Sequence, residues 1–298
     1  MTTTHISPDL GNLRRIAAFS SGHEGGNPAG VLITDHAPND SEMQAIAAEV
    51  GYSETAFASP DGEHWRVRYF SPEGEVDFCG HATIALGRAL SDLKGPARYD
   101  LRINAGDISV ASHTDDSGKT LIELQSPPTR SGPAEGAVLA EALALFDLSE
   151  EDLDPALPPA IANAGNDHLV LALRQRDRLA RMEYDLADGR RLMERHGLTT
   201  INLIVAGEDA LFLSRNAFAI GGVLEDPATG AAAAALAGYL RDIDWPLDWA
   251  PKETADAARA EIRIEQGDDM GIPSRLRVSI SPEKGAPVAV SGQARDIA

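Results

Sequence analysis

Short β-prone runs dominate the first half of the chain, and one of them, 65–70, alternates apolar and polar residues, a pattern that favours strands over helices. Strands are predicted over 15–19, 29–33, 53–58, 65–70, 98–103, 107–113 and 119–125. Helices are predicted over about 40–50, where Asp40 or Ser41 can cap the start, and over about 80–93. Prolines and glycines over 127–133 mark the end of this half.

The second half repeats the order of the first, as expected for two copies of one ancestral unit. The matched pairs are Gly26 with Gly165, Gly51 with Gly197, Phe70 with Phe218 and Gly80 with Gly230, spaced by 139, 146, 148 and 150 positions. These spacings rise in order, as small insertions into a duplicated sequence would produce. Two lobes are therefore predicted: an N-terminal lobe over 1–128, which the segment 286–298 can complete, and a C-terminal lobe over 129–285.

The helices that open at Gly80 and Gly230 are rich in alanine and glycine, and the second contains an unbroken alanine run over 231–235. Such thin helices fit inside a strongly curved sheet, where larger side chains would overpack. The predicted fold class is therefore α+β, with two pseudo-symmetric lobes, each a barrel-like, mainly antiparallel sheet around a central helix. The alternative is that these are exposed, alanine-rich surface helices.

Composition narrows the class of partner. The 298 residues carry a formal net charge of −20 without a basic cluster, which disfavours nucleic acid because phosphate binding needs Lys and Arg. A single cysteine excludes an internal disulfide and fits a reducing cytoplasm. We find neither a secretory signal nor a run of about 18 apolar residues that would span a bilayer. A cytoplasmic protein that acts on a small molecule is expected.

The segments over 75–83 and 225–231 echo each other, and each opens one of the thin helices. The first turn of a helix presents unpaired N–H donors and partial positive charge, and a glycine there lets a ligand approach the backbone. Gly80 and Gly230 are therefore expected to hold an anionic group in a shared cleft. Asp226 and Pro227 also have a purely structural reading, as the N-cap and first residue of the second helix.

Glu54 lies in a β-prone run of small and aromatic residues, where its carboxyl group is expected to be partly desolvated. Burial raises the pKa of a carboxyl group, which suits a general acid/base near neutrality. The alternative is an ordinary strand glutamate that faces solvent. Its counterpart in the second half is Thr200, so only one half offers a titratable base at this position.

Cys79 and His81 flank Gly80 at the start of the first helix. A helix N-terminus lowers a thiol pKa, so Cys79 can be a thiolate base or nucleophile, although a small buried thiol is an equally simple reading. The counterpart of Cys79 is Thr229, which excludes a proton exchange between two thiols. His81 can donate a hydrogen bond or relay a proton, or it can be a plain first-turn histidine. The histidines show no HExxH or comparable spacing, so no metal site is expected.

At these residues the chain resembles the PhzF family of phenazine biosynthesis, within the wider diaminopimelate-epimerase-like fold. The resemblance covers nearly the whole chain in the expected order. The matching motifs are Gly26-Asn27-Pro28-Ala29, Ser53-Glu54-Thr55, Phe78-Cys79-Gly80-His81-Ala82-Thr83, Glu225-Asp226-Pro227-Ala228-Thr229-Gly230 and Gly271-Ile272-Pro273-Ser274.

The resemblance implies a cofactor-independent isomerase, usually a homodimer, with its active site between two lobes. The characterised phenazine enzyme moves a proton between carbons of a dihydro-hydroxyanthranilate. Its catalytic glutamate matches Glu54, its Gly-His pair matches Gly80-His81, and its substrate-contacting aspartate matches Asp226. By the same comparison the expected substrate-binding positions are Asn27, Cys79, Gly80, Ala82, Thr229, Gly230 and Ala231.

Three positions depart from the family pattern. Ala231 stands where a serine is frequent, Ile272 where an arginine is frequent, and Ile220 where a proline is usual. The first two changes remove a hydroxyl and a positive charge that could contact a substrate carboxylate. They bear on the choice of substrate more than on the fold.

The leading hypothesis is an isomerase that moves a proton on a small carboxylate-bearing substrate, with Glu54, His81 and Asp226 as catalytic residues. A second hypothesis is a Cys/Thr-type epimerase or dehydratase led by Cys79. A third is a binding protein that keeps the fold without turnover. The substrate and its pathway do not follow from the sequence.

Overall fold

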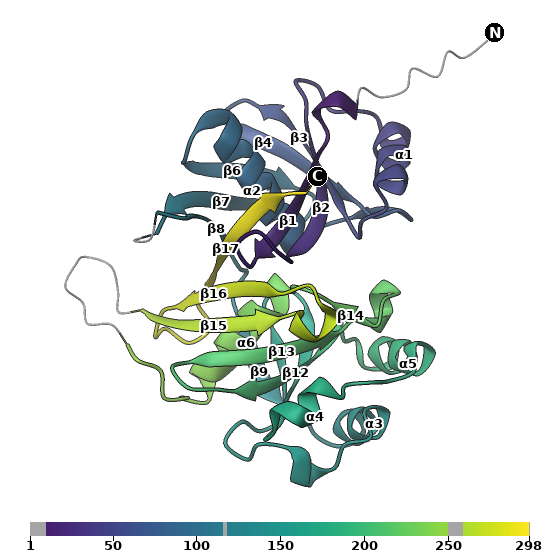
Figure 1. Cartoon of the computed structure of the whole chain (residues 1–298), viewed down its shortest axis with the longest axis vertical. Coiled ribbons are helices and arrows are strands. Elements are labelled where there is room, and N and C mark those ends of the chain that lie inside the picture. The colour runs from purple at the N-terminus through teal and green to yellow at the C-terminus, as the bar shows by residue number, and fades with distance from the viewer. Residues whose placement is uncertain (1–9, 116–117, 250–258, 298) are drawn as a thin grey trace. The chain divides into compact units, whose positions relative to one another are not determined.

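A computed structural model describes residues 10–115, 118–249 and 259–297, and its contacts divide the chain into two compact units (Figure 1). Unit 1 comprises Met1–Ala18, Pro28–Leu124 and Gln293–Ala298, and unit 2 comprises Phe19–Asn27 and Gln125–Gly292. The predicted lobes 1–128 and 129–285 differ from these units by a few residues at the central boundary and by the segment 19–27, and the completing segment 286–298 is divided between the units at Gly292. Residues 1–9, 116–117, 250–258 and 298 of these predicted ranges lie outside the described part. The boundaries fall inside four strands, since β1, β2, β8 and β17 each contribute residues to both units.

Unit 1 contains one long helix, α2, enclosed by strands (Figure 1). Its parallel pairs are β2 with β3 and β4 with β6, and its antiparallel pairs are β3 with β4, β4 with β5, β6 with β7 and β7 with β8. The elements are η1 (Leu10–Asn12), β1 (Arg14–Ser20), β2 (Asn27–Ile33), α1 (Asp40–Val50), β3 (Thr55–Asp61), β4 (His64–Phe70), β5 (Glu75–Val76), α2 (Gly80–Lys94), β6 (Arg98–Ile103), β7 (Gly106–Thr114) and β8 (Thr120–Gln125).

Helix α2 is thin because its surroundings leave no room for larger side chains. Most of its residues are buried, and a Cβ added at Gly87 would lie 2.6 Å from methyl groups of both Val110 and Ile122. The prediction of a central helix inside a curved sheet is confirmed, and the exposed-helix alternative is wrong. Small side chains let the strands close around the helix at interior packing density.

The N-cap of helix α1 lies one residue before Asp40, the earlier of the two predicted caps. Asn39 is the N-cap: its side chain accepts a hydrogen bond from the Glu42 backbone N–H at 3.0 Å, and the Glu42 carboxylate accepts from the Asn39 N–H at 2.9 Å. This reciprocal capping box satisfies two first-turn donors. The expectation that Asp40 or Ser41 caps the helix is therefore wrong, since Asp40 is already its first residue.

Unit 2 repeats this arrangement around α6 and adds helices α3 and α4 (Figure 1). Leu143 of α3, Leu179 of α4 and Leu203 of β12 belong to one buried apolar core. The elements are β9 (Arg130–Pro133), α3 (Ala137–Leu145), η2 (Glu150–Asp152), β10 (Ala160–Asn163), β11 (Asp167–Ala172), α4 (Arg176–Ala180), α5 (Leu186–His196), β12 (Thr200–Ala206), β13 (Leu211–Ala217), η3 (Ala219–Gly221), β14 (Glu225–Asp226), α6 (Gly230–Asp242), β15 (Ala260–Gln266), η4 (Asp268–Met270), β16 (Ser274–Ile280) and β17 (Ala289–Asp296).

The pairing registers relate the two units. The parallel pairs β2–β3 and β4–β6 of unit 1 recur as β11–β12 and β13–β15 in unit 2. Gly51 and Gly197 end α1 and α5 in the same left-handed conformation, as their matched positions predict. Phe70 faces Glu75 and Ala217 faces Glu225, so Ala217, not Phe218, occupies the position equivalent to Phe70. The described parts of the chain contain no helix with the length and apolar character needed to cross a membrane.

Candidate active site

The start of α2 is held in place by a chain of buried hydroxyl groups. The Thr83 hydroxyl donates to the Cys79 carbonyl at 2.7 Å, and the Thr83 N–H reaches the same oxygen at 3.0 Å. Because the single hydroxyl proton of Thr83 is used, the Tyr69 hydroxyl donates to Thr83 Oγ1 at 2.6 Å. Burial raises the pKa of Tyr69, so this phenol stays protonated. Strand β4 thereby fixes the backbone of Cys79.

The hairpin that leads into α2 is fixed by an ion pair. Arg68 on β4 donates to both carboxylate oxygens of Glu75 on β5, each at 2.6 Å, and to Asp40 at 2.6 Å. These hydrogen bonds lower the pKa of Glu75. A bidentate guanidinium–carboxylate pair has one preferred geometry, so it sets the direction in which the chain enters α2.

Glu54 stands immediately before β3. Its carbonyl accepts from the Gly30 N–H at 3.2 Å, and Gly30 pairs with Thr55 across the parallel strands β2 and β3. A Cβ at Gly30 would lie 2.6 Å from the Thr55 hydroxyl, so this close approach of the two strands requires glycine. Only 17% of the Glu54 side chain is exposed. The alternative of a glutamate that faces solvent is therefore wrong.

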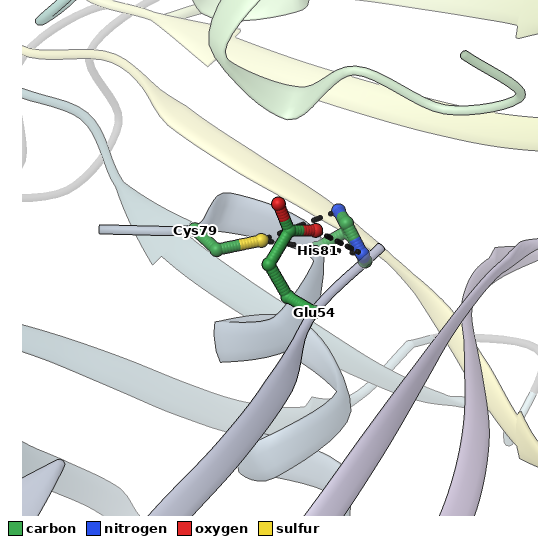
Figure 2. Close-up of side chains that lie close together, drawn as sticks. All are labelled: Glu54, Cys79 and His81. Atoms are coloured by element: carbon green, nitrogen blue, oxygen red, sulfur yellow. Dashed lines mark hydrogen bonds and ion pairs between the residues drawn. The ribbon is translucent and has the colours of Figure 1, made fainter. Parts of the chain in front are cut away.

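The side chains of Glu54, Cys79 and His81 converge (Figure 2). His81 Nε2 lies 3.4 Å from a Glu54 carboxylate oxygen and 3.4 Å from the Ser53 hydroxyl. His81 Nδ1 lies 3.4 Å from the Cys79 sulfur. Cys79 and His81 are buried, with 8% and 9% of each residue exposed. The imidazole therefore lies next to both a thiol and a carboxyl group, in a site that water reaches poorly.

This arrangement joins three groups that can carry a proton. An imidazole can donate through one ring nitrogen while it accepts through the other, so it can orient either neighbour or pass a proton between them. The distances of 3.4 Å exceed those of a tight hydrogen bond, as is common for catalytic groups without substrate. The cluster is chemically suited to taking a proton from carbon and returning it.

The backbone beside the cluster offers N–H donors. Cys79 is the N-cap of α2 and makes no side-chain capping hydrogen bond, so the first turn is not closed by a side chain at that position. Ala82 is fully buried, so neither its side chain nor its backbone is exposed to a ligand in this structure. An added Cβ at Gly80 would meet only Leu124, at 3.9 Å, which shows that packing does not require glycine there.

A second polar cluster surrounds Asp226 in unit 2. The Asn27 amide donates to Asp226 Oδ1 at 2.7 Å and to the Ala228 carbonyl at 3.0 Å. The Thr229 hydroxyl donates to Asp226 Oδ2 and accepts from the amides of Asn216 at 2.6 Å and Gln266 at 3.1 Å. The Thr229 hydroxyl is thus fully engaged, and both Asp226 oxygens act as acceptors.

The structural reading of Asp226 and Pro227 as helix cap and first helical residue is wrong. Helix α6 begins at Gly230 with Thr229 as its N-cap, and the Thr229 N–H donates to the Gln266 side chain at 3.2 Å. Asp226 belongs to the preceding strand β14, so its carboxylate does not cap the helix. The position of the Asp226 carboxylate is set instead by its tertiary hydrogen bonds with Asn27 and Thr229.

Asn27 is delivered by a tight loop. Gly25 has φ +58°, and a Cβ there would lie 1.8 Å from the Pro273 carbonyl oxygen. The next residue, Gly26, donates its N–H to the same oxygen at 3.1 Å. Two glycines are needed because the loop approaches the backbone of the Gly271–Ser274 motif this closely. The contact between the loop at 25–26 and the motif at 271–274 thus positions the Asn27 side-chain amide that donates to Asp226.

The predicted site residues therefore fall into two groups. Unit 1 holds Glu54, Cys79, Gly80, His81 and Ala82, and unit 2 holds Asn27, Asp226, Thr229, Gly230 and Ala231. Sequence reasoning missed the supporting residues Asn216 and Gln266, which are both buried although they are polar. Their signal in the sequence was weak, because an isolated amide in a strand reads equally well as a solvent-facing position.

At the position equivalent to Glu54, unit 2 has a different pair. The Thr200 hydroxyl lies 2.7 Å from His168 Nδ1, and His168 is buried on β11. Burial lowers the pKa of His168 to about 4, so the imidazole is neutral near pH 7. The two units therefore differ both at this position, Glu54 against Thr200, and in the histidine beside it, His81 against His168.

Comparison with known proteins agrees with this architecture. Residues 16–297 match the family model described as phenazine biosynthesis-like protein (PhzC-PhzF). An "Uncharacterized isomerase" of Deinococcus radiodurans is 33% identical over 275 residues, which cover 89% of this chain and 85% of that protein.

Solved structures share the fold. A PhzF-family protein of Bacillus anthracis superposes with a TM-score of 0.83 at 24% identity, covering 96% of each chain. A hydroxyproline epimerase of Agrobacterium vitis, solved with trans-4-hydroxy-L-proline, gives a TM-score of 0.60 at 11% identity, covering 96% of this chain and 88% of that one. The α+β, diaminopimelate-epimerase-like fold predicted from the sequence is confirmed. On the family-model match and the similarity to the Deinococcus protein, this chain belongs to the PhzF family of phenazine biosynthesis-like proteins.

Proposed function

We propose that this protein is a cofactor-independent isomerase that moves a proton between carbons of a small, carboxylate-bearing substrate. The observation that carries the proposal is the buried cluster in which His81 lies 3.4 Å from the Glu54 carboxylate. A relative in Deinococcus radiodurans is named an isomerase, and a protein of similar structure is named an epimerase. Both names support the same reaction class. The family resemblance also suggests a homodimer, which light scattering would test.

In this proposal Glu54 takes the proton from carbon and returns it, and His81 orients or relays. The carboxylate accepts the proton in its ionised form. The N–H groups at Gly80 would bind the substrate carboxylate or the developing oxyanion. Positioned acid/base transfer contributes on the order of 10²–10⁴-fold to the rate.

Deuterium incorporation tests the reaction directly. The protein is incubated in deuterated water with dihydro-hydroxyanthranilate or with trans-4-hydroxy-L-proline, and incorporation at carbon is followed by NMR. Glu54→Gln keeps the size of the side chain but removes the base, so incorporation should fall by about 10²-fold or more with folding unchanged. Retained incorporation in Glu54→Gln would reject the role of Glu54, and a lack of incorporation by the unaltered protein with either probe would reject these substrates.

A second candidate is a Cys79-led epimerase or dehydratase, favoured by the distance of 3.4 Å between the Cys79 sulfur and His81 Nδ1. Two-sided epimerisation needs a base on each face of the carbon, and the hydroxyl of Thr229 is engaged with Asp226. Cys79→Ala separates the candidates. Turnover should be nearly unchanged if Glu54 is the base and should be lost if Cys79 is. Under the Cys79-led reaction, trans-4-hydroxy-L-proline is the probe expected to exchange its α-proton.

A further inference from the structure

The cluster at Glu54 has a second chemical property that proton transfer does not use. Its three side chains offer a sulfur, a ring nitrogen and a carboxylate oxygen, and these ligand atoms all lie within 4.8 Å of one another. A thiolate with imidazole and carboxylate is a donor set that Zn²⁺ accepts, whereas Mg²⁺ and Ca²⁺ prefer oxygen alone. The spacing rule applied to the sequence missed this set because Glu54 lies far from Cys79 along the chain.

The ligand atoms lie close to the spacing of a tetrahedral metal site, which they reach when the side chains reorient around an ion. Bond lengths to tetrahedral Zn²⁺ are about 2.0–2.3 Å, which place neighbouring ligand atoms about 3.5 Å apart. His81 Nε2 lies 3.4 Å from Glu54 Oε2 and 4.0 Å from Cys79 Sγ. The Cys79 sulfur now lies closer to Nδ1, at 3.4 Å, than to Nε2, so the imidazole must turn and the thiol must move for all three groups to bind one ion through Nε2.

The charge of the three ligands and the hydrogen bonds that hold Cys79 also suit a divalent metal ion. A thiolate and a carboxylate together neutralise a divalent ion, so the buried site with bound Zn²⁺ carries no net charge, and the proton of the Cys79 thiol is released to water on binding. The Tyr69–Thr83–Cys79 hydrogen-bond chain fixes the backbone of the sulfur ligand, and such supporting contacts raise metal affinity. Three protein ligands leave a fourth position for water or a substrate oxygen.

We infer that Glu54, Cys79 and His81 form a reversible Zn²⁺ site and that the bound ion inhibits the protein. The ion would occupy the Glu54 oxygen and the His81 nitrogen, so neither could exchange a proton with substrate. The inhibitory part of this inference rests on the proposed function, and the binding part does not. The ion acts as a regulator of the reaction and takes no part in it.

Cobalt titration tests the binding part without turnover. Co²⁺ bound by a thiolate shows a sulfur-to-metal charge-transfer absorption in the near ultraviolet, and Cys79 is the only cysteine in the chain. The reduced full-length protein should show this absorption at one Co²⁺ per chain, and Zn²⁺ should displace it. Cys79→Ser should abolish the absorption, and Glu54→Gln should keep it but weaken affinity by about 10–100-fold.

His196→Gln is the matched control, since His196 lies 3.2 Å from the Glu141 carboxylate in a second histidine–carboxylate pair. It should bind Co²⁺ as the unaltered protein does. An absent absorption, or equal Zn²⁺ affinity in Cys79→Ser, would overturn the site. Zn²⁺ should also suppress deuterium incorporation reversibly on addition of EDTA. Absorption without turnover on either probe would reject those two substrates and leave the metal site standing, and turnover that stoichiometric Zn²⁺ leaves unchanged would overturn the inhibitory part.

Discussion

At the scale of single residues, equivalent positions in the two units carry different chemistry. Glu54 of unit 1 lies beside His81, whereas Thr200, its counterpart, is hydrogen-bonded to His168 at 2.7 Å. Cys79 has a thiol in contact with an imidazole, whereas the hydroxyl of its counterpart Thr229 is engaged with Asp226. The two units thus share backbone positions but carry different side chains, and at the position of Glu54 and Thr200 only unit 1 has a carboxyl group.

His168 gives a prediction on pH and stability. Burial lowers its folded pKa to about 4 from the usual 6.5, so the unfolded chain binds more protons between these values. Stability contributed by neutral His168 is therefore full above about pH 6.5 and is lost as pH falls toward 4, by about 3 kcal/mol in total. Urea unfolding of His168→Asn should show a shallower loss between pH 6.5 and 4.5 than the unaltered protein.

The exposed residue His113 provides the control for this measurement. Because water solvates its ring in the folded and unfolded states alike, His113→Asn should leave the slope of stability against pH unchanged. An identical slope for His168→Asn and the unaltered protein would contradict the assignment of the acid sensitivity to His168.

At the scale of elements, the same ion pair steers the chain into both central helices. Arg68 binds Glu75 before α2, and the register places Arg215 and Glu225 at the equivalent positions before α6. The second pair is more deeply buried: 12% of the Arg215 side chain and 5% of the Glu225 side chain are exposed. Arg215 also donates to the carbonyls of Ala180 and Met182, so it ties the helix entrance to the end of α4.

Removing each arginine should have unequal effects. Arg215→Met leaves a buried carboxylate and several carbonyls without their donor, and it should destabilise unit 2 by about 3–5 kcal/mol. Arg68→Met breaks a pair that water reaches more easily and should cost about 1 kcal/mol or less. Urea unfolding followed by circular dichroism measures both. Equal losses would show that burial does not decide the strength of this shared pair.

At the scale of the whole molecule, the candidate functional residues are divided between two units, with Glu54 in one and Asp226 in the other. The family resemblance implies that both serve one reaction. We therefore expect their roles to be coupled in catalysis.

A double-mutant cycle measures this coupling. Asp226→Asn removes the charge that the amide of Asn27 and the hydroxyl of Thr229 hold in place, and turnover should fall by about 10²-fold or more. Residues that act on one transition state give non-additive losses, so Glu54→Gln with Asp226→Asn should be little worse than Glu54→Gln alone. Losses that multiply would indicate independent roles, and an Asp226→Asn protein with full turnover would exclude Asp226 from the reaction.

The sequence by itself determined the elements, the internal repeat and the family. Strand alternation and helix starts are local patterns, so the predicted strands and helices of unit 1 match those observed to within a few residues. The alanine and glycine content predicted the thin helices, and the motif at 78–83 predicted the position of the candidate site. Boundary details such as the Asn39 cap escaped because several neighbouring residues can cap equally well.

The tertiary structure alone decided which side chains meet. Glu54 and His81 come together because β3 and α2 pack within one unit, and no spacing along the chain predicts a distance of 3.4 Å. Asn216 and Gln266 became part of the Asp226 cluster because strands β13 and β15 pair side by side. Local sequence sets the backbone through periodicity and capping, whereas hydrogen-bond partners far apart in sequence depend on how the sheet closes.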